Sequence, residues 1–235
     1  PKLLDARDEL REVLVELGDL DAAEEVVTET LGILRAALDH DPRGQRQRAA
    51  LVETWIDRGH LEHATRSSGR RFFDSSPKDP GTQASLEREL GYYEEAIGVA
   101  LGLRDQRHAA LLKARVNKAS TLYECGRREA ARDEALGIVR LAEDHPGVNV
   151  RLKREATMVL GATYVSLGEH EKAIRLLAPV QREMQASHCV ACCRGIFEAI
   201  TRNLRSARRG WLLGQWKARS TTGKPPSGAD RAEDP

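Results

Sequence analysis

One pattern recurs five times along the chain: an apolar-periodic segment, a glycine in a short polar turn, and an alanine five residues after that glycine. The glycines are Gly18, Gly59, Gly91, Gly126 and Gly168, and the alanines are Ala23, Ala64, Ala96, Ala131 and Ala173. The intervals between successive glycines range from 32 to 42 residues. Recurrence on this scale is typical of solenoids and other repeat arrays. The pattern therefore predicts five helix-turn-helix units of unequal length.

Each part of the unit has a physical reason. Glycine at the turn takes the left-handed conformation that ends a helix, because it has no Cβ to clash. Alanine lets the second helix approach the first closely. Apolar residues four and eight positions before the glycine share one helix face, as do Leu10 and Leu14, or Leu160 and Tyr164. The third unit is the weakest, because Pro80 cuts its first helix short.

These units resemble the tetratricopeptide repeat family, whose motif places a small residue, an aromatic or Leu, a turn glycine and an alanine in this order. The fifth unit matches best, through Leu160, Gly161, Tyr164, Gly168, Ala173 and Leu177. The fourth matches through Ala119, Leu122, Gly126, Ala131 and Ala135, whereas the first has Arg11 where the small residue belongs. The resemblance covers residues 3–180. It implies a right-handed α-solenoid.

We therefore expect an all-α fold: a right-handed α-solenoid of five such repeats, closed by a C-terminal capping helix. The expected repeats span residues 3–40, 45–74, 80–108, 109–145 and 151–186, followed by a capping helix over 190–218 and a disordered tail over 219–235. The capping helix would bury Ile196, Phe197, Ile200 and Leu204 on one stripe. Pro179 is expected to kink or end the helix that contains it.

The two ends of the chain carry opposite charge. Residues 1–62 hold fifteen acidic and eight basic residues, a net charge of −7, and residues 194–224 hold eight basic residues against Glu198, a net charge of +7. The family resemblance implies that ligands lie along a concave groove lined by the first helix of each repeat. Candidate groove residues are Asp5, Asp8, Glu12, Glu16, Glu53, Asp57, Lys113, Asn117, Ser120 and Tyr123. An acidic groove favours a basic peptide, although the same charges would also suit a solvated helix face.

The basic C-terminal segment has several interpretations. It could contact nucleic-acid phosphates, lie on an anionic membrane, or fold onto the acidic groove of another copy. The favoured interpretation is a capping helix in which Trp211 and Trp216 pack on the fifth repeat. No segment has the roughly 18 to 20 consecutive apolar residues that cross a bilayer, and the start does not resemble a signal peptide. We therefore expect a cytoplasmic protein without a transmembrane segment.

Catalytic and metal-binding motifs are weak. Cys189, Cys192 and Cys193 form one cluster with no second ligand pair, so small thiols are favoured over a metal or redox site, and their role stays open. His60 and His63 lack the spacing of a zinc motif, and His60 is predicted on the turn after Gly59. No phosphate-binding loop or nucleophile elbow is present. We expect that the protein is not an enzyme and that it binds no cofactor or metal.

The leading prediction is a scaffold or adaptor that binds a protein or peptide in its groove. One alternative, which the resemblance implies, is a sensor or regulatory region of a larger bacterial signalling or transcription regulator. Another is nucleic-acid or membrane contact through the basic C-terminal helix, with nucleic acid the less favoured partner.

Overall fold

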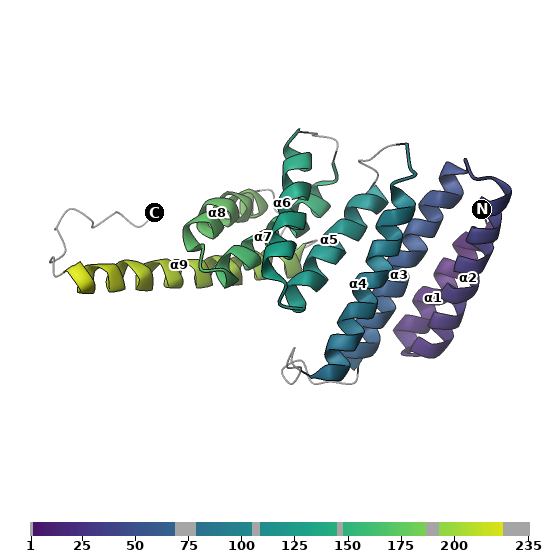
Figure 1. Ribbon diagram of the computed structural model, residues 1–235, viewed down its shortest axis with the longest axis horizontal. Helices are drawn as coiled ribbons and strands as arrows, with labels where there is room; N and C mark the ends of the chain where they lie inside the picture. The colour runs from purple at the N-terminus through teal and green to yellow at the C-terminus, as the bar shows by residue number, and fades with distance from the viewer. Residues whose placement is uncertain (1, 69–78, 105–108, 145–147, 187–192, 223–235) are drawn as a thin grey trace. The chain divides into compact units, whose positions relative to one another are not determined.

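The computed structural model describes residues 2–68, 79–104, 109–144, 148–186 and 193–222, which form helices with no strand among them (Figure 1). In chain order they are α1 (Lys2–Leu17), α2 (Leu20–His40), α3 (Gln45–Ser68), α4 (Pro80–Ala100), α5 (Ala109–Glu124), α6 (Arg128–Asp144), α7 (Val150–Ser166), α8 (His170–Ala186) and α9 (Arg194–Thr222). The predicted all-α class is confirmed for these residues. They separate into two compact units, 1–159 and 160–235, and the division falls within α7.

In the first unit each helix packs on the next one in the chain, from α1 to α6, and α3 also contacts α5. Figure 1 shows α1 to α5 lying side by side. Consecutive packing of this kind is the arrangement of an α-solenoid, in which each helix pair contacts its neighbours.

Three of the five predicted turns are present. Gly18, Gly126 and Gly168 have φ angles of 80°, 80° and 75°. After each of them, the backbone N–H of the next residue donates to a carbonyl five positions back, as Asp19 N does to Leu14 O at 2.9 Å. This is the hydrogen bond of a Schellman motif, which satisfies carbonyls that the helix end leaves unpaired.

The turns predicted at Gly59 and Gly91 are wrong, because both glycines lie inside continuous helices, α3 and α4. In place of the helix pairs predicted within 45–74 and 80–108, the described residues hold one long helix each, α3 and α4, and α3 packs along α4. A glycine inside a helix costs about 1 kcal/mol relative to alanine. Burial of apolar side chains on both sides of the glycine outweighs this cost, since each contributes about 1.5 to 3 kcal/mol. In α4 the large side chains of this kind are Leu86 and Leu90, and Tyr93 is buried beyond the glycine.

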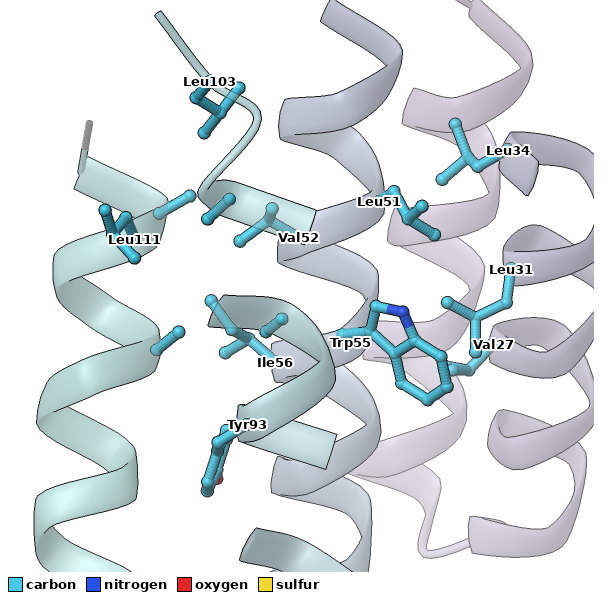
Figure 2. Packing of buried hydrophobic residues seen from close by; sticks show 14 of the residues in the cluster. Val27, Leu31, Leu34, Leu51, Val52, Trp55, Ile56, Tyr93, Leu103 and Leu111 are labelled. Atoms are coloured by element: carbon cyan, nitrogen blue, oxygen red, sulfur yellow. The ribbon is translucent and has the colours of Figure 1, made fainter. Parts of the chain in front are cut away.

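Gly59 has a packing role in place of the predicted turn. A Cβ at this position would lie 2.5 Å from the ring of Tyr93, so only glycine lets α4 approach α3 so closely. The surrounding core joins α2, α3, α4 and α5. Figure 2 shows the indole of Trp55 beside Val27 and Leu31 of α2. Tyr92 stacks on Trp55 with ring centroids 6.0 Å apart.

The second unit contains the end of α7 with α8 and α9. A Cβ at Gly161 would lie 2.5 Å from Leu177, so this glycine permits the close approach of α7 and α8. Pro179 lies inside α8, so of the two predicted effects, a kink or the end of the helix, the end is wrong. Helix α9 packs on α8 and buries Ile200 and Leu204 of the predicted stripe.

The C-terminal boundary of the predicted capping helix also needs correction. Helix α9 begins at Arg194 and runs to Thr222, so the first residues of the predicted disordered tail are helical. The remainder of that tail, residues 223–235, lies outside the described residues.

Candidate functional site

The candidate site is a cavity of about 180 Å³ between α1, α2 and α3. Its apolar wall consists of Leu4, Val26, Val27, Leu34 and Ala50, and its polar wall of Asp5, Arg7, Asp8, Arg11, Thr30, Glu53, Thr54 and Asp57. Four carboxylates face two guanidinium groups, which leaves a formal charge of −2. An acidic cavity with an apolar wall suits a side chain that has both an alkyl stem and a cationic head.

Helical spacing brings the polar residues together. Asp8 and Arg11 are three positions apart on α1, and Glu53 and Asp57 are four apart on α3, so each pair shares one helix face. The predicted groove residues Asp5 and Asp8 on α1 therefore line the same cavity as Glu53 and Asp57 on α3. Glu12 and Glu16 are exposed on α1 and do not line it.

Arg11 is the central cation of this site. Its Nη2 lies 2.7 Å from Asp8 Oδ1 and 3.6 Å from Glu12 Oε1, and its Nε lies 3.5 Å from Asp57 Oδ2. Burial acts to lower the pKa of Arg11, but Asp57, Asp8 and Glu12 together raise it, so it stays charged. Sequence reasoning missed this role. The signal was present in its spacing from Asp8, because such i,i+3 pairs form on helix surfaces.

Asp57 is the least favourably placed carboxylate in the cavity. Its side chain is only 17% exposed. Burial raises its pKa to about 6, although the positive charges of Arg11 and Lys113 act in the opposite direction. At neutral pH this carboxylate is ionised in surroundings that only partly compensate its charge. An additional cation in the cavity would stabilise the ionised form.

Lys113 and Asn117, two of the predicted groove residues of α5, contact α3 and do not line the cavity. Lys113 Nζ lies 3.0 Å from Glu53 Oε2, and Asn117 Nδ2 lies 2.9 Å from His60 Nε2. His60 is inside α3, so its predicted place on a turn is wrong.

Ser120 and Tyr123, the remaining predicted groove residues, also lie away from the cavity. Both are half-buried in α5. The ring of Tyr123 lies 3.9 Å from the guanidinium of Arg128, at the start of α6. The structure therefore divides the predicted groove into the cavity at α1 and α3 and a separate set of contacts made by α5.

A second polar cluster, which sequence reasoning missed, surrounds Glu89 of α4, a residue only 3% exposed. Its Oε2 accepts a 2.6 Å hydrogen bond from Arg66 of α3, and its Oε1 accepts one of 2.9 Å from Thr121 of α5. Tyr93 also donates to Oε1 at 3.3 Å. Burial acts to raise the pKa of Glu89, but its contacts with His63 and Arg66 outweigh this and lower it. The cluster joins three helices through buried hydrogen bonds, and Arg66 also borders a cavity with Glu62, Ser85 and Arg88.

Helix α9 differs from the predicted cap in its second half. Trp211, Leu212, Leu213 and Trp216 are between 42% and 66% exposed. Trp211 borders a cavity at the start of α8, whereas Trp216, which was also predicted to pack on the fifth repeat, is 66% exposed.

Cys189 and Cys192 of the predicted thiol cluster lie outside the described residues, and Cys193 is half-buried before α9. Within the part of the chain that the structure describes, no group of three or more His, Cys, Asp or Glu side chains is arranged to hold a metal ion. In the same residues, no helix combines the length and apolar character needed to cross a bilayer.

Comparison with known proteins found no matching family model and no matching curated protein.

Proposed function

We propose that this chain is a protein-interaction module that binds a basic segment of a partner protein on the acidic face of α1 and α3. The observation that carries the proposal is the cavity with a formal charge of −2, in which Asp57 is ionised at neutral pH despite its burial. A cationic side chain from the partner would offset the free-energy cost of burying the ionised Asp57, because a nearby opposite charge favours the ionised carboxylate.

The size of the cavity supports one inserted side chain over a whole small molecule. Ligand pockets for small molecules enclose roughly 300 to 1,000 Å³, and this cavity encloses about 180 Å³. The alkyl stem of an Arg or Lys would lie along Val26, Val27 and Ala50, and its head would reach the carboxylates. We favour Arg, because its planar fork binds two carboxylates at once.

Recognition of this kind works by shape and charge complementarity and needs no bond to be made or broken. The Schellman turns at Gly18, Gly126 and Gly168 and the chain-order packing support a tetratricopeptide-like interpretation of the helix pairs around them. The single long helices α3 and α4 depart from it.

A peptide array would test the proposal. Each immobilised peptide carries one central Arg or Lys in varied flanks, and every binder is resynthesised with Gln at the centre and measured by isothermal titration calorimetry. We expect the Gln peptide to bind about tenfold or more weakly. Asp57→Asn should weaken binding of the Arg peptide similarly, whereas Glu95→Gln, at an exposed carboxylate on α4, should not. Equal binding of the Arg and Gln peptides would contradict the proposal.

Binding should also depend on pH. As the pH falls through about 6, Asp57 takes up a proton and the cavity loses one negative charge. The affinity for the Arg peptide should therefore fall over this range in the wild type, and the Asp57→Asn variant should not show this decrease. Titrations on either side of this pH would measure it, and an affinity that rises on acidification would argue against Asp57 as the anionic contact.

A further inference from the structure

Helix α1 exposes an apolar stripe to solvent. Leu3, Leu10, Val13 and Leu17 are between 48% and 76% exposed, and Ala6 between them is also exposed. These residues are separated by alternating intervals of three and four positions, so they follow one line along the helix. A continuous exposed apolar patch marks an interaction surface more often than chance exposure does.

A row of carboxylates runs beside this stripe. Asp5, Glu9, Glu12 and Glu16 are all exposed and follow the spacing i, i+4, i+7, i+11, which places them on a neighbouring line of α1. The surface of α1 along this row of carboxylates is therefore strongly negative. A partner for this face would therefore be a helix with exposed apolar residues and positive charge.

The second half of α9 has this chemistry. Arg205, Arg209, Leu212 and Trp216 are exposed and follow the same spacing, i, i+4, i+7, i+11. They lie on a different line of α9 from Ile200, Leu204 and Ala207, which are buried in the packing with α8. Arg202, Arg208 and Lys217 add exposed positive charge on the same helix.

We infer that the exposed half of α9 in one copy of this chain docks on the apolar and acidic face of α1 in a second copy. Trp216 and Leu212 would cover part of the stripe formed by Leu3, Leu10, Val13 and Leu17, and Arg205 and Arg209 would face the carboxylate row. Each copy carries both surfaces, so the contact is head-to-tail and can continue from copy to copy. One contact then covers two apolar faces that each chain leaves exposed.

This surface is distinct from the proposed peptide site. Asp5 borders both surfaces, but the cavity is otherwise lined on α1 by Leu4, Arg7, Asp8 and Arg11, on a different side of the helix, and neither Glu9 nor Glu16 lines it. Variants at Glu9 and Glu16 therefore test the contact between copies without removing a cavity residue, and failure of one proposal leaves the other standing.

Charge reversal with rescue is the decisive experiment. Sedimentation velocity of the full chain over a wide range of concentration measures association of the wild type, of Glu9→Lys/Glu16→Lys, and of Arg205→Glu/Arg209→Glu. The control is Glu95→Lys/Glu129→Lys, at exposed positions on α4 and α6. All four reversed positions of the test variants are exposed, and circular dichroism confirms that each variant is folded.

The wild type and the control should associate as concentration rises, more weakly at higher salt, and each reversal should weaken association by about tenfold or more. An equimolar mixture of the two reversal variants should restore it, because the basic α1 of one then meets the acidic α9 of the other. Leu212→Ser/Trp216→Ser should weaken association without changing its salt dependence.

Two outcomes would overturn the inference: a wild type with the mass of one chain at every concentration, or association that neither reversal changes. Vesicles of phosphatidylserine and phosphatidylcholine serve as a second probe. Their capture by a monomeric wild type, lost on Arg205→Glu/Arg209→Glu, would assign α9 to an anionic membrane instead.

Discussion

Replacing Asp57 by Asn should stabilise the folded chain at neutral pH while weakening the proposed binding. The neutral amide has nearly the shape of the carboxylate but carries no charge to bury. Asp57 titrates near 3.8 when solvated and near 6 in the folded protein, where burial is the largest cause of the change. The attraction of Arg11 and Lys113 is already contained in that value, since both act to lower it.

The magnitude and the pH window follow from linkage. Between pH 3.8 and about 6 the unfolded chain has released the Asp57 proton and the folded chain still holds it, so rising pH favours unfolding. Two pKa units, at about 1.4 kcal/mol each, correspond to about 3 kcal/mol. The variant and the wild type should therefore differ little near pH 3.8, and the variant should become more stable up to a plateau above pH 6.

Urea denaturation of both proteins at a series of pH values would measure the difference in free energy of unfolding. The control is Glu95→Gln, an exposed carboxylate whose removal should give no comparable rise. A difference that does not change with pH would refute the reasoning. A difference that falls as the pH rises would show that the pairing with Arg11 outweighs burial.

Two further predictions concern the packing of α3 and α4. Gly59→Ala should lower the free energy of unfolding, because its Cβ would meet the ring of Tyr93 at 2.5 Å. Gly91→Ala should raise the free energy of unfolding by up to about 1 kcal/mol, because its Cβ would meet nothing within 4 Å. Thermal denaturation would compare the two variants, and equal effects would contradict the roles assigned to the two glycines. Glu89→Ala should cost up to about 3 to 5 kcal/mol in chemical denaturation, because it removes the closer of the two carboxylates that pair with the buried Arg66. A loss below about 1 kcal/mol would show that the remaining partner, Glu124, compensates for the lost pair.

Local sequence signals predicted the helical class and three of the five turns. At Gly18, Gly126 and Gly168 the glycine follows an apolar helix and is followed by a polar residue, and the left-handed conformation there is decided within a few residues. The same motif at Gly59 and Gly91 gave the wrong prediction. A single glycine is compatible with both a turn and a helix, and the choice between them depends on what the flanking side chains bury.

Part of the candidate site could also be predicted from spacing along single helices. The acidic character of α1 and α3 follows from Asp8, Glu53 and Asp57, because residues three or four apart share a helix face whatever the tertiary structure. That these residues line one cavity could not be predicted, since it depends on how α1, α2 and α3 pack together. Glu89 was missed for a related reason: a carboxylate on an apolar stripe is recognised as buried only when its partners on two other helices are known.

The sequence alone determined the helical class, where three helices end, and how charge is distributed from one end of the chain to the other, because these properties depend on neighbouring residues. Tertiary structure decided that Gly59 admits the ring of Tyr93 in place of a turn, that Arg11 joins the carboxylates of α1 and α3, and that Trp216 remains exposed. Each of these outcomes depends on contacts between residues far apart in the chain, and a pattern of neighbouring residues does not specify which distant residues come into contact.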